Sequence, residues 1–213
     1  MKINTLKMKK KLKDFKCNDN YLEVFKRHTP DGSDAFFKGI FSSLTSVYGF
    51  INYKTAKDDI LELLESKISS EYKMNPFYEV WINDMANICK CFCSFLTEQR
   101  ISFWIGSKRG CKRYHVDLVA FRLLVTYAGQ GTEILPNHAA NRTAFLKGMP
   151  NNKIVKNKSA IRYLNRWDIA IFKGGNKSIL HRTPNSALFD GSSILMRLDK
   201  ASFLEDIKKI NVI

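Results

Sequence analysis

From residue 101 onwards, the sequence breaks into short runs of β-branched and aromatic residues separated by Gly, Pro and Asn. Short runs bounded by turn residues are typical of β-strands. Eight runs fit this description: 101–105, 112–117, 120–127, 132–134, 142–146, 168–172, 178–181 and 193–198. Eight strands suit a jelly roll, in which two sheets pack face to face. The sequence therefore predicts a β domain over residues 101–213.

The first hundred residues differ, because their apolar residues recur at helical spacing. Thr55, followed by acidic residues in the next turn, marks a helix start. After a break at Asn75 and Pro76, apolar residues recur at steps of three and four: Phe77, Trp81, Met85, Ile88, Phe92, Phe95 and Leu96. This pattern predicts a long amphipathic helix that ends near Arg100.

Two other stretches of this region are less regular. Residues 36–41 are apolar and fit either a helix or a strand, and the lysine-rich residues 1–16 are expected to be disordered. The expected fold class is thus α+β. A mainly helical region, 1–100, packs against a cupin-like β domain, 101–213.

The five cysteines do not form a recognisable metal or disulfide pattern. Cys89, Cys91 and Cys93 lie in the expected long helix, and their spacing differs from that of zinc sites, so we interpret them as small buried side chains. No apolar run reaches the roughly 18 residues of a membrane-spanning helix, and the first residues do not resemble a secretory signal. We therefore expect a cytoplasmic protein with no membrane partner.

The segment His115-Val116-Asp117 is the main candidate for chemistry. Alternate residues of a strand point the same way, so His115 and Asp117 share one face. With the distant His181 they have the composition of a two-His-one-carboxylate site, which holds Fe(II) and leaves positions open. Such a short motif is weak alone. The same ligands could hold zinc or another ion, or the pocket could be polar but inactive.

The order of motifs around these residues resembles a known family. The HxD segment is followed by a strand ending in Tyr127 and by Gly-Gln-Gly-Thr-Glu, then by Asp-Ile-Ala-Ile-Phe, His-Arg-Thr-Pro and a last strand containing Arg197. This order resembles the double-stranded β-helix of Fe(II)/2-oxoglutarate-dependent oxygenases. More closely, it resembles a bacterial domain family of unknown function, number 1826, over about half of the chain.

The resemblance implies roles for individual residues. His115, Asp117 and His181 would be the metal ligands, with Fe(II) as the metal and 2-oxoglutarate as the co-substrate. Arg197 would bind the distal carboxylate of 2-oxoglutarate, a task that suits the guanidinium fork. Ser186 or Tyr127 could add a hydroxyl to the same carboxylate. The expected function is an oxygenase of the hydroxylase or demethylase type, with an unknown substrate.

Several other charged residues receive structural interpretations. Arg122 lies inside an apolar strand and needs a partner, for which Glu133 or Asp168 is expected. Arg182 follows His181 and should face the opposite way, as a surface charge. His28 and His138 lie in turn-rich segments and are expected to be solvated.

The net charge of +15 is unevenly distributed. Residues 108–182 contain fifteen Lys or Arg against Asp117, Glu133 and Asp168. Basic flanks attract acidic ligands such as nucleic acid, a phosphorylated metabolite, an acidic protein or 2-oxoglutarate. The alternative function is accordingly a non-catalytic or zinc-holding module that binds nucleic acid or another acidic partner. No recognisable nucleic-acid-binding motif supports it.

Overall fold

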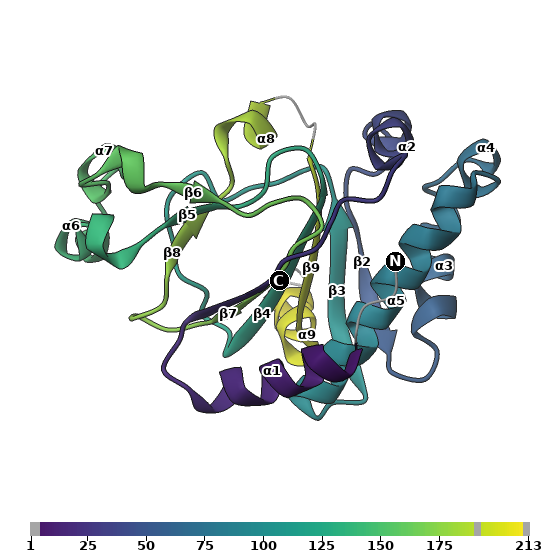
Figure 1. The fold of residues 1–213 in the computed structure, drawn as a ribbon, viewed down its shortest axis with the longest axis horizontal. Coiled ribbons are helices and arrows are strands. Elements are labelled where there is room, and N and C mark those ends of the chain that lie inside the picture. Colours follow the sequence, from purple (N-terminus) through teal and green to yellow (C-terminus); the bar gives the residue numbers. More distant parts are fainter. Residues whose placement is uncertain (1–4, 190–192, 211–213) are drawn as a thin grey trace.

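The computed structural model of the protein describes residues 5–189 and 193–210. Its centre is a six-stranded antiparallel sheet with the order β1-β7-β4-β9-β3-β2 (Figure 1). The strands in that order are Leu22–Phe25, Ile169–Lys173, Phe121–Ala128, Ile194–Lys200, Arg100–Gly106 and Val47–Asn52. A smaller sheet has the order β6-β5-β8, formed by Arg162–Tyr163, Glu133–Leu135 and Leu180–Arg182. Together with the helices, these sheets confirm the expected α+β class.

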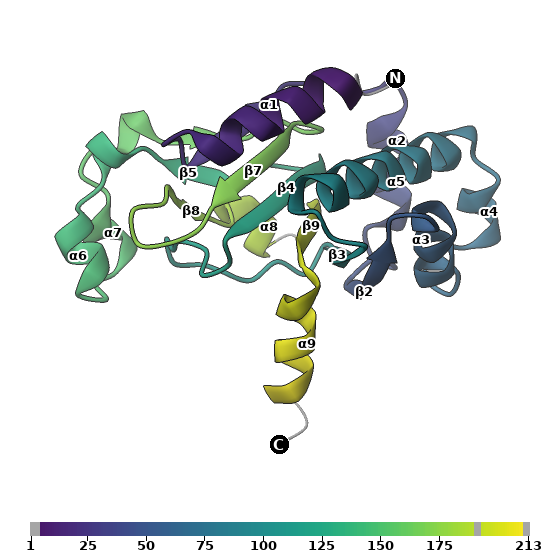
Figure 2. The same ribbon diagram turned by 90° about the horizontal axis from the view of Figure 1, so that it is seen from below.

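Most of the helical residues precede β3 or follow β5. The first group contains α1 (Thr5–Cys17), α2 (Ser33–Ile40), α3 (Ala56–Leu64), α4 (Ser70–Lys73) and α5 (Pro76–Leu96). The second contains η1 (Asn137–Ala139), α6 (Arg142–Leu146), α7 (Asn151–Ile154), η2 (Lys158–Ala160), α8 (Asn185–Phe189) and α9 (Ala201–Ile210). Figure 2 shows α1 and α5 on the same side of the large sheet. None of the described helices is long and apolar enough to cross a membrane.

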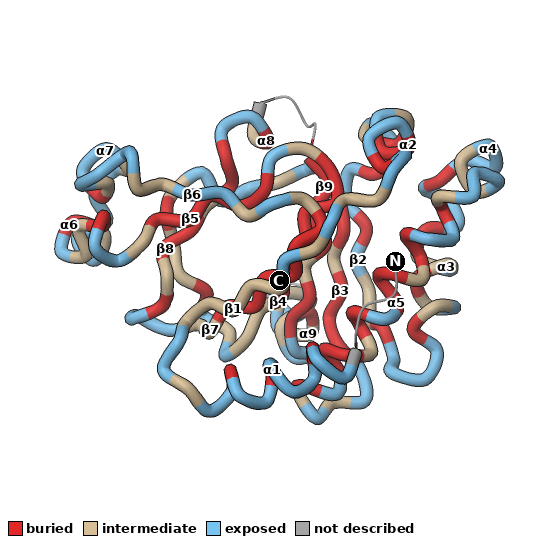
Figure 3. The backbone as a smooth tube through the Cα atoms, in the orientation of Figure 1, coloured by how far each residue is buried: buried red, intermediate tan, exposed pale blue. Residues whose placement is uncertain are grey.

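Side-chain alternation gives the large sheet two different faces. Leu123 and Met196 point towards the helices and belong to the main hydrophobic core. Their neighbours Leu124 and Leu195 point the other way and pack with Ile134 of the small sheet. Figure 3 shows that buried residues follow the strands of both sheets. Alternate residues of β4 and β9 therefore face the small sheet, and the candidate site lies among them.

The helix α5 forms where its sequence pattern predicts it. The Asn75 side chain accepts a hydrogen bond of 2.9 Å from the Phe77 amide, which satisfies one free N–H group of the first turn. The helix ends at Thr97, whose backbone is left-handed with φ 61°. The free thiols of its three cysteines, Cys89, Cys91 and Cys93, are all buried, which confirms their interpretation as packing residues.

The structure corrects the expectation for the first hundred residues. The lysine-rich start forms α1 from Thr5, because Met8, Leu12 and Phe15 lie on one face and are almost fully buried. Residues 1–4 lie outside the described part. Two strands of the large sheet, β1 and β2, also come from this region, so the helical and β regions share one sheet. Both strands are too short for their period to stand out among helices.

Two strand predictions in the β region are also wrong. Residues 142–146 form the short helix α6, which begins where the Asn141 side chain accepts a hydrogen bond of 3.1 Å from the Ala144 amide. Residues 112–117 make only a single bridge, at His115, instead of a continuous strand. Runs of five or six residues do not distinguish strand from helix by periodicity.

Candidate metal centre

Backbone pairing places the two histidines side by side. His115 and His181 form an antiparallel bridge in which each amide donates to the other residue's carbonyl, at 3.0 and 3.1 Å. Residues paired in this way project their side chains on the same face. The two imidazole centroids are accordingly 4.4 Å apart.

A glycine turn holds Asp117 near the histidines. The Gly175 amide donates to the Asp117 carbonyl at 2.9 Å. A Cβ atom at Gly174 would lie 1.9 Å from the Val119 carbonyl oxygen, so only glycine permits this close approach. One possible ligand atom from each of His115, Asp117 and His181 lies within 4.8 Å of the others. The structure thus brings together the three residues that the motif singles out.

The imidazoles are oriented so that one nitrogen of each can bind a metal. The Nδ1 atom of His115 lies 3.2 Å from the Arg113 carbonyl, and that of His181 lies 3.2 Å from the Ile179 carbonyl. A carbonyl only accepts, so these contacts favour protonated Nδ1 and leave both Nε2 lone pairs free. Burial lowers the pKa of His181 to about 4, with the nearby Asp117 opposing the shift. The imidazole is therefore neutral at physiological pH.

The two oxygens of Asp117 have different environments. Oδ1 pairs with the guanidinium of Arg122, whose Nε donates to Asp199 at 2.7 Å. Oδ2 is buried, lies 3.5 Å from His181 Nε2 and accepts no hydrogen bond from the described residues. A buried carboxylate oxygen without a donor is costly unless a cation satisfies it. The carboxylate and the two imidazoles, each with its Nε2 lone pair free, therefore fit a divalent metal ion.

The expected partners of Arg122 were wrong. Its carboxylates are Asp117 and Asp199, which come from the segment before β4 and from β9. Glu133 instead pairs with Arg182, and Asp168 accepts a hydrogen bond from the Arg27 amide. Strand alternation explains the result, because Arg122 and Asp199 point from β4 and β9 towards the small sheet.

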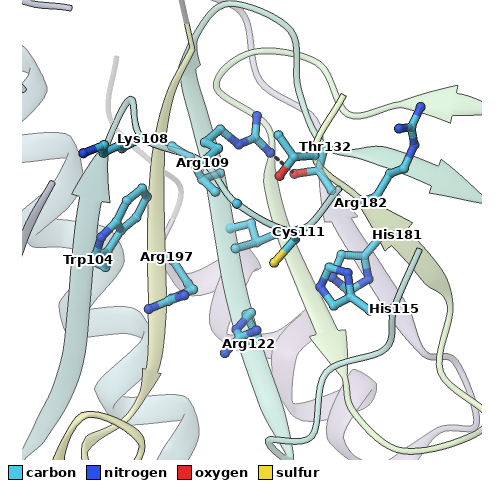
Figure 4. A pocket seen from close by; sticks show the side chains of 14 residues that line it. Trp104, Lys108, Arg109, Cys111, His115, Arg122, Thr132, His181, Arg182 and Arg197 are labelled. Carbon is cyan, nitrogen blue, oxygen red and sulfur yellow. Dashed lines mark hydrogen bonds between the residues drawn. The ribbon is translucent and has the colours of Figure 1, made fainter. Parts of the chain in front are cut away.

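A cavity of about 280 Å³ adjoins the histidines. Its wall includes His115 and His181 together with Arg109, Arg122 and Arg197 (Figure 4). The lining of the cavity is therefore rich in cations, as an anionic ligand requires.

Arg197 lies on the wall of this cavity, at the centre of the large sheet. Its Nε is 3.1 Å from Asp199 Oδ2, close enough for an ion pair but without hydrogen-bond geometry. Its guanidinium also lies 5.7 Å from the ring centroid of Trp104 and 5.0 Å from that of Phe203. The aromatic rings and Asp199 thus hold the guanidinium at the cavity.

The structure does not bring Tyr127 or Ser186 to the cavity. Tyr127 is fully buried on the helix side of the large sheet, where its hydroxyl donates to Asp84 at 2.9 Å. Ser186 is exposed in α8 and donates to the Gln130 side chain at 2.6 Å. Neither residue lines the cavity. Successive residues of a strand point to opposite faces of the sheet. Leu124 of β4 faces the small sheet, so Tyr127, three positions later, faces the helices and cannot reach the cavity.

A buried carboxylate joins the two segments that carry the histidines. Glu133 of β5 accepts two hydrogen bonds of 2.8 Å from Arg182 and one from the hydroxyl of Tyr114. Arg182 follows His181, and Tyr114 precedes His115. Arg182 was expected to be a surface charge, and this was wrong, because its side chain is only 14% exposed and pairs with the buried carboxylate of Glu133.

Sequence reasoning gave no role to several polar residues on the cavity wall, among them Arg109 and Thr132. Arg109 precedes the HxD motif by several positions, and only its place in a basic stretch distinguished it. Thr132 belongs to the Gly-Thr-Glu motif but had no assigned role. His28 and His138 are exposed, which confirms the prediction that they are solvated.

A comparison with curated proteins finds no match. A family model described as Protein of unknown function (DUF1826) matches residues 7–199. The match extends from within α1 into β9, the last strand, well beyond the half of the chain on which the resemblance rested. The chain therefore belongs to the DUF1826 family.

Proposed function

We propose that this protein is an Fe(II)/2-oxoglutarate-dependent oxygenase. The observation that carries the proposal is the convergence of His115, Asp117 and His181 beside a cavity, with the buried Oδ2 of Asp117 left without a hydrogen bond. Two imidazoles and one carboxylate on one face of a metal are the ligand set of non-haem Fe(II) oxygenases.

The strand order supports a double-stranded β-helix for this activity. Within the large sheet, β7, β4, β9 and β3 are neighbours, and the small sheet continues from β8 to the bridge at His115. From β3 onwards, with the bridge at His115 counted as part of the small sheet, the chain alternates between the two sheets, apart from the consecutive pair β5 and β6. This alternation is the connectivity expected of an eight-stranded jelly roll.

The residues of the chain have separate tasks in the proposed site. The three ligands would hold iron, while the Arg113 and Ile179 carbonyls orient the imidazoles and Arg122 orients Asp117. Arg197 would bind a carboxylate of 2-oxoglutarate through its guanidinium. When bound, iron with 2-oxoglutarate and O₂ would supply the oxidising chemistry, with succinate and CO₂ as co-products.

An anaerobic titration tests the proposal. Fe(II) and then 2-oxoglutarate are added to the purified protein, and visible absorbance is recorded for the wild type, His181→Ala and His138→Ala. A charge-transfer band that requires both additions is expected in the wild type and in His138→Ala, whose histidine is exposed. It should be absent in His181→Ala.

Turnover of 2-oxoglutarate to succinate gives a second measurement. Replacing His115 or His181 by Ala should abolish turnover and leave the fold intact by circular dichroism. A band or turnover retained in either variant would refute the assignment. Tight binding of zinc, without any response to 2-oxoglutarate, would instead favour the non-catalytic binding module.

A further inference from the structure

Arg109 is a half-buried cation whose described partners are all neutral. Its Nη1 donates to the Gln130 carbonyl at 3.2 Å and to the Ser193 hydroxyl at 3.0 Å, and its Nη2 donates to the Thr132 hydroxyl at 3.0 Å. Its Nε is buried and has no partner among the described residues. No carboxylate of the described part of the chain pairs with this guanidinium.

The other arginines around the cavity are compensated. Arg182 pairs with Glu133, whereas Arg122 and Arg197 lie beside the two buried acids Asp117 and Asp199. The latter set contains two positive and two negative charges. The charge of Arg109 therefore remains unbalanced, and a bound divalent ion would increase the local excess of positive charge.

Thr132 supplies a second donor beside Arg109. Its hydroxyl oxygen accepts from Arg109, and its own proton has no acceptor among the described residues. Both residues line the cavity, and Figure 4 shows the Arg109 guanidinium next to Thr132, apart from the two imidazoles and from Arg197. A guanidinium and a hydroxyl in one wall form the donor set that an oxyanion needs.

The rim of the cavity reinforces this preference for anions. Lys108 lines the cavity and is exposed. The three acids of residues 108–182 are all buried, so the described surface of this stretch carries cations alone. Residues 55–100 differ, with five Lys or Arg against eight Asp or Glu, a net charge of 5 − 8 = −3. The excess in 108–182 is 15 − 3 = +12, so the lysine-rich composition alone does not explain it.

We propose that Arg109 and Thr132 form an oxyanion subsite in this cavity, which takes a carboxylate or phosphate group. The subsite is separate from Arg197 and requires no metal. Two ligands could supply the oxyanion: the co-substrate 2-oxoglutarate or an anionic primary substrate. The assignment of either role rests on the proposed function, whereas the binding of an oxyanion does not.

Binding of inorganic phosphate to the metal-free protein tests the subsite itself. Isothermal titration is carried out with the wild type, Arg109→Met, Thr132→Val and Thr132→Ser. We expect roughly tenfold to hundredfold weaker binding in Arg109→Met, since a charged donor is lost. Thr132→Val should weaken binding less, and Thr132→Ser, which retains the hydroxyl, should behave like the wild type.

Matched controls separate a specific site from general charge effects. Lys153→Met removes one exposed cation from α7 and should leave phosphate affinity unchanged. Arg109→Lys retains the positive charge and should therefore bind phosphate more tightly than Arg109→Met. This difference would attribute the loss of affinity in Arg109→Met to the missing charge and not to a folding defect. The proposal is overturned if Arg109→Met, folded by circular dichroism, binds phosphate like the wild type, or if the wild type binds none.

Asp190 lies outside the described residues and provides one further control. An internal counter-ion at that position would make phosphate bind only to Asp190→Asn, and this result would also overturn the proposal. Equal phosphate affinity in the wild type and Asp190→Asn supports an open subsite.

The 2-oxoglutarate titration of the iron-loaded protein identifies the source of the oxyanion. If Arg109→Met loses phosphate binding but retains 2-oxoglutarate affinity, the subsite serves an anionic substrate. If it loses both, the subsite takes the co-substrate carboxylate. Phosphate binding that depends on Arg109 without any 2-oxoglutarate band would support the subsite while refuting the oxygenase.

Discussion

At the scale of single residues, Glu133 is expected to control the metal site without touching the metal. Its carboxylate ties Arg182, next to His181, to Tyr114, next to His115. Glu133→Gln removes the charge but retains the approximate shape. We expect metal affinity to fall by roughly tenfold to hundredfold, as for other residues that orient metal ligands.

The free energy of unfolding should fall as well, by about 3 kcal/mol, because the variant leaves Arg182 without its counter-ion. Metal affinity and urea unfolding are measured together. Glu79→Gln is the control, since Glu79 is exposed and pairs only with surface residues. Wild-type metal affinity in a destabilised but folded Glu133→Gln would show that the contact is merely structural.

The buried imidazole of His181 makes the stability of the metal-free protein depend on pH. Burial lowers its pKa from 6.5 to about 4 in the folded protein. Between these pH values the unfolded state binds a proton that the folded state does not. The neutral His181 therefore makes its full contribution to the free energy of unfolding above pH 6.5. As the pH falls towards 4, this contribution is lost, and the free energy of unfolding decreases by about 3 kcal/mol, since the folded and unfolded pKa values differ by 2.5.

Urea unfolding of the metal-free protein at a series of pH values checks this expectation. His138→Ala should follow the wild-type curve, because that histidine is exposed. His181→Asn removes the titrating group and should flatten the curve over the same interval. Identical curves for the wild type and His181→Asn would contradict the prediction.

The three residues of the candidate metal centre could be singled out from the sequence, but the residues around them could not. The HxD spacing pointed to His115 and Asp117, although in the structure a bridge at His115 and a glycine turn at Asp117, and not a continuous strand, bring them together. The partners of Arg122 depend on which strands become neighbours, and Asp199 is 77 positions away in the chain. Arg109 was missed for the same reason, since Thr132 and Ser193 meet it only in the folded protein.

At the scale of elements, the packing of α5 leads us to expect that the five thiols differ in their rate of modification. Its cysteines Cys89, Cys91 and Cys93 are buried, and burial raises the pKa of each thiol, for Cys93 to about 11. Cys17 and Cys111 are exposed. We expect a maleimide to modify two thiols quickly in the folded protein and all five after unfolding.

Mass spectrometry of the intact protein counts the modified thiols, and peptide mapping identifies them. The variant Cys17→Ser should leave one fast thiol, at Cys111. Rapid modification of Cys89 in the folded protein would contradict the packing of α5 against the sheet.

Element length decided which local predictions succeeded. Helix α5 is long enough for many apolar residues to fall on one face, so its period was clear. The five residues of α6 and the four of β1 provide too few repeats, and neighbouring elements select their conformation. Strands β3, β4, β7 and β9 were found near their true bounds, because apolar residues and flanking glycines mark them.

At the scale of the whole molecule, both outer strands of the large sheet come from the first hundred residues. β1 pairs with β7, and β2 pairs with β3. A fragment of residues 101–213 would leave two strand edges unpaired and would also lose α5 from the core. We expect this fragment to aggregate, because bare edges pair with other chains.

The soluble fraction and near-ultraviolet circular dichroism of the purified fragment measure this outcome. Adding residues 5–100 as a separate chain should increase the soluble fraction if the lost pairing is the cause. A monomeric fragment with native-like spectra would show that the β region folds alone.

The order of strands also governs how the protein is made. β1 leaves the ribosome early, but its partner β7 begins at Ile169, and β9, which lies between β4 and β3, ends only at Lys200. At the usual pace of synthesis, the first strand waits for roughly 7 to 30 seconds before its partner exists. During this interval the growing chain contains the outer strands of the large sheet but lacks β7 and β9, which lie inside it. A chaperone would therefore be most needed at this stage of translation.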